Sequence, residues 1–310
     1  MITRNDSKRR WPLFEIAMLL LGILFVSPCL LAVINSLKPL PAIRENPFAP
    51  PSGLYLDSYR FLFTKARLAG PMVNSLIMCI VVILALITTA PMAAYSMTRR
   101  RMASGKFLRL FFLAGLTIPF QIIMVPLLKE FKTIGAASIS VLDRVAPAAG
   151  VHATTYGTAG ETLLAQSGAD FSYFALWVHY VSWGLPLCIF IYSGFMSTIP
   201  KEMEESAALD GCGSVSTFWR IIFPLLVPCT ITVIIFWGLW IWNDFMQAFI
   251  IVGPRAQLVF VQLYTFLTDK YVKNWSNIFA GTVVLSLPVT VLYLLMQRRF
   301  IKGLMAGALK

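Results

Sequence analysis

Charged residues and histidines are scarce in this sequence. Of its 310 residues, 13% are charged and 58% are hydrophobic, and the mean hydropathy is +0.74. Several apolar runs come close to the roughly 20 residues that a helix needs to cross a bilayer. The scarcity of charge argues against a soluble domain of this size, and the apolar runs indicate a polytopic helical membrane protein.

Disulfide and metal-binding patterns are also lacking. The cysteines are odd in number and lie mostly inside apolar runs, at Cys29, Cys79, Cys188, Cys212 and Cys229. The two histidines, His152 and His179, are distant in sequence from any cysteine or acidic cluster. These spacings predict neither a disulfide framework nor a metal site.

Acidic residues are few, at 14 against 26 Lys and Arg, and the formal net charge is +12. Such a charge would suit a nucleic-acid partner. The basic residues, however, cluster beside apolar runs, where cytoplasmic loops and anionic lipid headgroups favour them. We therefore expect contact with membrane lipid and not with nucleic acid.

Six candidate membrane spans divide the chain. They cover Phe14–Leu37, Val73–Met97, Leu108–Leu128, Tyr173–Thr198, Phe223–Val252 and Trp275–Met296. The predicted fold class is all-α, with residues 1–70 as a first helix plus extracytoplasmic loop and residues 71–310 as the membrane core. The short connections on one side carry more than half of the basic residues. By the positive-inside rule we expect both termini to be cytoplasmic.

An acidic segment interrupts this pattern between the fourth and fifth spans. Four of the 14 acidic residues fall between Glu202 and Asp210. Pro200 suits a first helical turn, the glutamates suit the positive end of a helix dipole, and Gly211 then ends the helix. The segment therefore predicts a short cytoplasmic helix that lies outside the membrane.

One face of that short helix consists largely of small side chains. Glu204, Ala207, Ala208 and Gly211 recur at i, i+3, i+4 and i+7. Such a face allows close approach of another surface, whereas a helix resting on lipid headgroups would expose Lys and Arg. We therefore expect a protein partner for this helix.

The acidic segment and its flanks resemble a known family. The order EESAALDG at Glu204–Gly211, followed by IIFPLLVP, is similar to the cytoplasmic loop of ABC importer permeases, whose pattern is Glu-Ala-Ala, then Gly, then Ile and Leu-Pro. Further similarities are NSL at 74–76, AAYSMTRRR at 93–101, WNDF at 242–245 and QRRFIKGLMAGALK at 297–310. Together they resemble the carbohydrate-uptake branch in the bacterial inner membrane, in particular the second permease of maltose-type systems.

Two features depart from the pattern of that family. Ser206 stands where the first alanine of the triplet is usual, which enlarges the small face slightly. Residues 136–172 form a longer connection than the family's, rich in Ala, Gly, Ser and Thr. We interpret this segment as an extracytoplasmic surface insertion or, alternatively, as a contact with an extracytoplasmic partner.

The resemblance implies a transporter subunit and not an enzyme. The implied partners are a second permease, two ATPase subunits and an extracytoplasmic solute-binding protein, and the implied cargo is a sugar or oligosaccharide. ATP and magnesium would bind the ATPases. This sequence has no G-x-x-x-x-G-K-[ST] phosphate loop and is expected to hold no cofactor. The implied ATPase-coupling residues are Glu204, Glu205, Ser206, Ala207, Ala208, Asp210 and Gly211.

Candidate substrate contacts occur in the fifth span. Trp240, Asn243, Asp244 and Gln247 recur at i, i+3, i+4 and i+7, which would set an aromatic ring and three hydrogen-bonding groups on one helix face. Sugars bind to flat apolar surfaces and to hydrogen-bonding groups. Asp244 is the only acid well inside a span, and such groups usually face protein or water. A packing or gating role is the alternative.

Two further groups are candidates. Thr117 and Gln121, one turn apart in the third span, would contribute to the same path, with interhelical hydrogen bonding as the alternative. Gln262, Tyr264 and Tyr271 lie in the extracytoplasmic connection 253–274. In maltose-type systems the counterpart of this connection reaches the ligand cleft of the binding protein. A helix resting on the membrane is the alternative here.

An ion-driven secondary transporter of a small polar solute is the alternative function. That mechanism normally needs buried carboxylates, and a single acid well inside a span argues against it. A membrane enzyme is a further alternative, but the sequence shows no constellation of nucleophile, base and metal.

Overall fold

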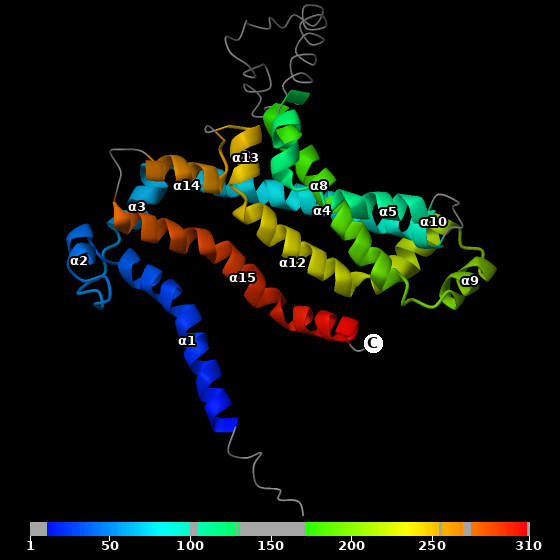
Figure 1. Ribbon diagram of the computed structural model, residues 1–310, viewed down its shortest axis with the longest axis horizontal. Coiled ribbons are helices and arrows are strands. Elements are labelled where there is room, and N and C mark those ends of the chain that lie inside the picture. Colours follow the sequence, from blue (N-terminus) through cyan, green and yellow to red (C-terminus); the bar gives the residue numbers. More distant parts are fainter. Residues whose placement is uncertain are drawn as a thin grey trace, which may run out of the picture. The chain divides into compact units, whose positions relative to one another are not determined.

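The computed structural model describes residues 11–99, 105–127, 129–130, 171–253, 256–268 and 274–308 (Figure 1). Within these ranges the chain forms helices and connecting turns, and no strand. The predicted insertion at 136–172 lies outside the described residues except for its last two positions.

The described helices are numbered in chain order. Their bounds are α1 (Trp11–Ser36), α2 (Leu40–Glu45), α3 (Asp57–Thr64), α4 (Ala69–Arg99), α5 (Gly105–Gly115), α8 (Phe171–Met196), α9 (Glu202–Leu209), α10 (Ser214–Thr217), the π-helix η2 (Phe218–Ile222), α11 (Phe223–Leu225), α12 (Val227–Asn243), α13 (Met246–Ile251), α14 (Val259–Thr268) and α15 (Trp275–Ala308).

Four of the described helices are long and apolar enough to cross a membrane. These segments are Phe14–Ser36, Ala69–Arg99, Tyr173–Met196 and Trp275–Leu295. A fifth span results if Ser214–Leu225 and Val227–Asn243, which meet at an angle of 73°, together cross once. The prediction of an all-α membrane protein is therefore confirmed, whereas six separate spans stay a prediction.

Two predicted spans are wrong as continuous helices. In the third, α5 ends at Gly115, a turn follows, and helix resumes at Phe120. Pro119 accounts for this turn, because proline disfavours helical geometry at the preceding residue and lacks an N–H donor. In the fifth, helix is interrupted at Leu226 and again after Asn243.

The chain divides into two compact units. The first comprises Met1–Ala69 and Leu263–Thr290, and the second comprises Gly70–Gln262 and Val291–Lys310. In the first unit, the end of α1 is fixed by a 2.7 Å hydrogen bond between the hydroxyls of Ser36 and Tyr59. From Phe14 to Leu30 nearly all side chains of α1 are exposed, as expected for a helix whose surroundings are lipid or another subunit, whereas Asn35 and Ser36 at its end are buried.

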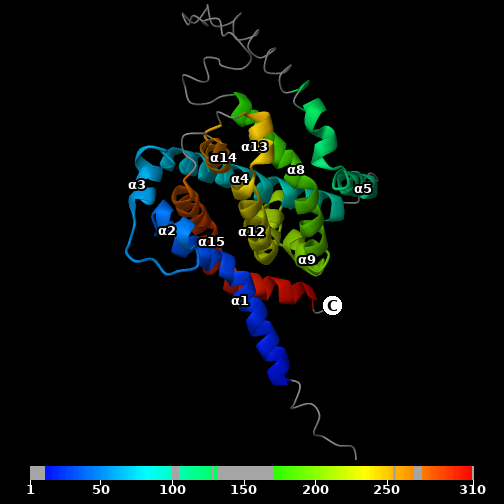
Figure 2. The same ribbon diagram turned by 60° about the vertical axis from the view of Figure 1, so that its left-hand side comes forward.

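Helix α8 is the centre of the second unit. It packs against α5, α12 and α13, and Figures 1 and 2 show α9 and α13 at opposite ends of it. Its Gly184 lies where a Cβ atom would come 2.8 Å from Leu86 Cδ1 of α4 and 3.3 Å from Trp237 Cε2 of α12. Small residues permit such close helix packing in a membrane, where burial in lipid gives no hydrophobic advantage.

Replacing Gly184 with valine should destabilise this three-helix contact. The added methyl groups overlap with Leu86 and Trp237, and overpacking of this kind costs about 1–3 kcal/mol. The matched control is Gly194→Val on the same helix, because no atom lies within 4 Å of the Cβ position there. Thermal unfolding in detergent should show a lower midpoint for the first variant only; equal midpoints would contradict the packing argument.

Candidate functional site

The acidic helix α9 forms where the sequence predicts it. Its first turn carries Glu202, Glu204 and Glu205, whose charges suit the positive end of the helix dipole. The backbone N–H groups of Glu204 and Glu205 donate to the carbonyl oxygen of Lys201. Gly211 follows the helix with a φ of +80°, a left-handed conformation that glycine adopts without strain.

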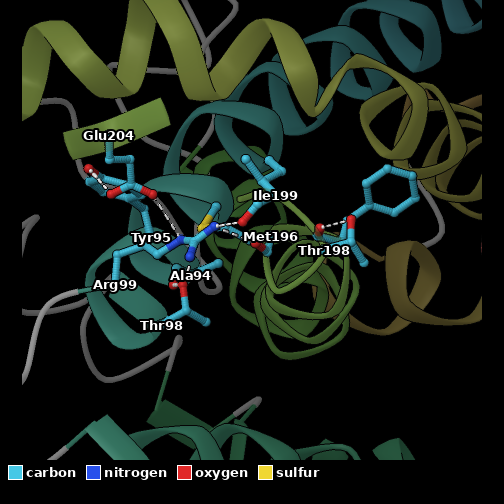
Figure 3. A network of polar contacts seen from close by, with 9 residues as sticks. Ala94, Tyr95, Thr98, Arg99, Met196, Thr198, Ile199 and Glu204 are labelled. Atoms are coloured by element: carbon cyan, nitrogen blue, oxygen red, sulfur yellow. Dashed lines mark hydrogen bonds and ion pairs between the residues drawn. The ribbon is translucent and has the colours of Figure 1, made fainter. Parts of the chain in front are cut away.

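Glu204 is bound within the chain. Arg99, the last residue of α4, places its Nε 2.9 Å from Glu204 Oε1, and Tyr95 donates its hydroxyl to Glu204 Oε2 at 3.0 Å. Arg99 Nη2 also donates to the main-chain oxygens of Met196, the last residue of α8, and of Ile199 just beyond it (Figure 3). The side chain of Arg99 is 8% exposed. One guanidinium thus holds α4, α8 and α9 in a fixed arrangement.

Only part of the predicted small face of α9 is exposed, because the rest contacts other helices of the protein. Glu204 is paired with Arg99, and Ala207 is buried at 3% exposure. The members of the predicted coupling set that are exposed are Glu205, Ser206, Ala208, Asp210 and Gly211. Leu209, which the sequence analysis did not single out, is 90% exposed. An apolar side chain in this position offers contact area to a partner.

The segment after α9 leads directly into a membrane helix. α10 packs against α9, and η2 follows with its Phe218 ring centroid 5.3 Å from that of Tyr95. π-helical turns are rare in proteins, and those that occur are often at functional sites. A bend of 73° then separates α10–α11 from α12. A displacement of α9 would therefore reach α12 through a short, packed connection.

At the far end of α12, Asp244 stands at a break between helices. α12 ends at Asn243, and the extended backbone of Asp244 starts a new direction. Its Oδ2 accepts a hydrogen bond of 2.9 Å from the N–H of Ala248 and one of 2.7 Å from the hydroxyl of Tyr180, while Oδ1 accepts a bond of 3.3 Å from the N–H of Gln247. Asp244 thus caps α13 and fixes it to α8.

The predicted single stripe is therefore wrong in its geometry. The sequence analysis placed Trp240, Asn243, Asp244 and Gln247 on one continuous helix, whereas the break separates the first two from Gln247. The amide of Asn243 donates to the carbonyl of Leu239 in its own helix at 2.7 Å. The physical reason is that the Asp244 carboxylate satisfies N–H groups of a second helix, which a continuous helix would not leave available.

Gln247 is held from α8 by His179. The two side chains are buried at 5% and 4% exposure, and His179 Nε2 lies 2.9 Å from Gln247 Oε1. The imidazole is surrounded by aromatic rings, with the centroid of Phe120 at 5.3 Å and that of Trp183 at 6.1 Å. The side chain of Gln247, in the first turn of α13, therefore has a fixed orientation.

A cavity of about 410 Å³ joins the two groups of candidate substrate residues. Thr117 lines it from the turn after α5, and Gln121 from the helix that resumes at Phe120. The other side is lined by Trp240 of α12, Asp244 at the break and Gln247 of α13. A second cavity, of about 500 Å³, lies against Trp240, Asn243 and Asp244. Five of the six candidate residues thus line the first cavity, and Asn243 lines only the second.

Sequence reasoning missed three residues of this region. Trp183 lines the cavity. His179 and Tyr180 do not line it but form hydrogen bonds to two residues that do, Gln247 and Asp244 respectively. His179 and Trp183 are four residues apart on α8 and so share a face. That spacing was visible in the sequence, but His179 was considered only as a metal ligand. Among the described residues no group of three or more His, Cys, Asp or Glu could hold a metal ion.

The connection before α14 is anchored to neighbouring helices. Asn74 donates its amide to the carbonyl of Gln257 at 3.0 Å, and Ser75 Oγ accepts a hydrogen bond of 2.9 Å from the N–H of Val259. In the predicted binding-protein contact, Gln262 donates its amide to the carbonyl of Ala256 at 2.9 Å. Tyr264 is 41% exposed, and Tyr271 lies outside the described residues.

Comparisons with known proteins agree on one class of membrane protein. Residues 86–305 match the family model of binding-protein-dependent transport system inner membrane components. The chain is 28% identical over 292 residues to the probable starch degradation products transport system permease protein AmyC of Thermoanaerobacterium thermosulfurigenes, covering 94% of each chain. It is 30% identical over 262 residues to the melibiose/raffinose/stachyose import permease protein MelC of Bacillus subtilis, covering 84% of this chain and 83% of MelC.

A solved structure has the same fold. It is a chain of a bacterial ABC transporter involved in the import of the acidic polysaccharide alginate, with a TM-score of 0.72 and 16% sequence identity. The match covers 97% of this chain and 100% of the other.

Proposed function

Because the chain belongs to the family of binding-protein-dependent transport system inner membrane components, we propose that it is the permease subunit that moves a sugar or oligosaccharide in an ATP-driven importer. It is a multi-pass membrane protein and not an enzyme. The sugar assignment is supported by its similarity to AmyC and MelC, which are described as permeases for starch degradation products and for melibiose, raffinose and stachyose. It is also supported by the cavity, where Trp183 and Trp240 offer aromatic surface and Gln121 and Gln247 offer hydrogen bonds.

The same proposal assigns six membrane spans with both termini in the cytoplasm. The bent pair α10–α12 would form the fifth span, and the broken segment from α5 through Phe120 would form the third. Broken helices are tolerated in a membrane where they line a cavity, and the turn at Thr117 lines one. In this orientation α9 is cytoplasmic, and the cavity lies beside Trp183, about midway along α8.

ATP binding is assigned to separate ATPase subunits, with magnesium, and this chain itself holds no cofactor. The coupling surface is the exposed side of α9, from Glu205 to Gly211. Two observations support this assignment. Arg99 binds α9 through its ion pair with Glu204, and the connection from α9 to α12 is short. ATPase closure would move α9 as a rigid body and switch the cavity between its two sides.

The remaining partners are a second permease, which would contact this chain within the membrane, and an extracytoplasmic binding protein. The complex of a related alginate transporter with its periplasmic protein supports the second assignment. On this chain, the binding protein would contact the connection around α14, including Gln262, Tyr264 and Tyr271.

Copurification of the chain with an ATPase subunit, and sugar uptake measured in the same strain, test this proposal. The solubilised chain should copurify with an ATPase subunit, and sugar uptake should stop when ATP is depleted but continue with an uncoupler that leaves ATP intact. Cysteine at Tyr264 should crosslink to the binding protein when all components are present. Uptake that fails with the uncoupler and persists without ATP would show an ion-driven transporter instead.

A further inference from the structure

The cavity between α8, α13 and the turn after α5 has an unbalanced charge. Its lining includes the carboxylate of Asp244, and among the described residues that line it there is no lysine or arginine. Asp244 also lines the neighbouring cavity of about 500 Å³, whose other described lining residues are uncharged. A solute that enters either cavity therefore meets a negative charge.

The oxygens of Asp244 are already engaged inside the protein. The carboxylate accepts hydrogen bonds from the Tyr180 hydroxyl and from the N–H groups of Gln247 and Ala248. These contacts fix its position, so that its charge cannot swing away from an approaching solute. Asp244 therefore acts on the cavity mainly through its electrostatic field.

Gln247 presents hydrogen-bond donors to the same cavity. Its Oε1 lies 2.9 Å from His179 Nε2, and with the ring nitrogen as donor the amide NH₂ group is left for the cavity that Gln247 lines. The indole rings of Trp183 and Trp240 provide apolar surface beside it. Donors with aromatic surface suit the hydroxyls and C–H faces of a sugar ring.

We propose that this cavity is a sugar subsite that admits uncharged sugar units and excludes acidic ones, with Asp244 as the residue that determines this specificity. The inference rests on the proposed function, because it assigns the substrate class of that pathway. At about 6 Å from a fixed carboxylate, a second negative charge is disfavoured by roughly a hundredfold at an effective dielectric constant near 20. The carboxylate of a uronate unit would meet this repulsion, whereas a neutral hexose would not.

Charged thiol reagents measure this field without knowledge of the transported sugar. The probe is Met246→Cys, because Met246 is 48% exposed and lines the cavity. The background is Cys29→Ser with Cys212→Ser, since Cys79, Cys188 and Cys229 are buried. The reagents are methanethiosulfonates that carry a neutral, a trimethylammonium or a sulfonate group, applied to membranes that contain the complete transporter.

The expected result is reaction with the neutral reagent and a cation-to-anion rate ratio about tenfold higher than in the same probe combined with Asp244→Asn. Tyr180→Phe removes a hydrogen bond from the carboxylate but leaves its charge, and should keep the high ratio. Thr117→Lys leaves the cap on α13 intact and adds a positive charge to the cavity, and should lower the ratio even where Asp244→Asn does not fold.

Two results would overturn the inference. One is a rate ratio that Asp244→Asn leaves unchanged in folded protein, and the other is a probe that the neutral reagent does not reach. ATP-driven sugar uptake combined with such a ratio would reject the charge selection and leave the proposed function in place. A strong charge preference in a protein whose uptake ignores ATP depletion would reject the proposed function alone.

Discussion

Arg99→Ala should abolish most ATP-driven uptake while the protein still inserts into the membrane. The change removes the ion pair with Glu204 and the two hydrogen bonds to main-chain oxygens at the end of α8. Glu204, whose side chain is 18% exposed, keeps its hydrogen bond to Tyr95 but loses the contact with Arg99, and each lost hydrogen bond to a charged group typically costs about 1.5–3 kcal/mol. That cost exceeds what a short helix such as α9 can compensate, so α9 should lose its fixed orientation and bind the ATPase roughly tenfold or more weakly.

Two variants separate the contributions of Arg99. Arg99→Lys keeps a positive charge near Glu204 but lacks the planar fork that also reaches Met196 and Ile199, and should retain only part of the uptake. Glu205→Gln is the matched control, because Glu205 is exposed in the same helical turn. It should leave protein stability unchanged and affect only association with the ATPase. Stability is measured by thermal unfolding and association by pull-down.

One result for Arg99→Ala would contradict this prediction. Full uptake with unchanged ATPase association would show that α9 holds its orientation without the contacts drawn in Figure 3. The rigid mounting of the helix would then be rejected as the basis of coupling.

Gly211→Val should also impair coupling, through the backbone. Gly211 has a φ of +80°, and a β-branched residue in this conformation costs about 1–3 kcal/mol. No neighbouring atom lies within 4 Å of the Cβ position, so the cost comes from backbone strain and not from a clash. The turn between α9 and α10 should rearrange, and uptake should fall by roughly tenfold or more while the amount of inserted protein is unchanged.

Gly213 provides a control two residues further along the chain. Its backbone is extended, with a φ of −71° and a ψ of 157°, and its Cβ position is equally open. Valine favours such a conformation, so Gly213→Val should retain near-normal uptake. Asparagine tolerates positive φ better than valine does, and Gly211→Asn should lie between the two. If Gly211→Val and Gly213→Val transport equally well, the left-handed turn is not needed for coupling.

The acidic helix and its glycine stop could be predicted from the sequence, because their signals are local. Three glutamates in one turn and a glycine directly after the helix act within a few residues, whatever the chain packs against. The hydropathy of the long helices is local in the same sense, and α1, α4, α8 and α15 appeared close to their predicted positions. The resemblance to importer permeases rested on such short motifs, and the family match confirmed it.

The candidate cavity could be predicted only in part. Periodicity predicted Trp240 and Gln247 on one helix. The helix breaks at Asp244, whose carboxylate accepts hydrogen bonds from Tyr180 of α8 and from N–H groups in the first turn of α13. One partner of that carboxylate, the Tyr180 hydroxyl, lies 64 residues away in sequence, and no local pattern indicates it. The cavity could still be anticipated in composition, since its aromatic and amide side chains were among the candidates.

The sequence by itself determined which segments are helical, which are apolar and where the acidic helix lies, because propensity, hydropathy and turn chemistry act over a few neighbouring residues. Only the tertiary structure decided which side of α9 is exposed and which residues share the cavity. The pairing of Glu204 with Arg99 and of Gln247 with His179 joins residues from different helices. Such contacts depend on how the helices pack, since a buried polar group takes the partner that packing places within reach.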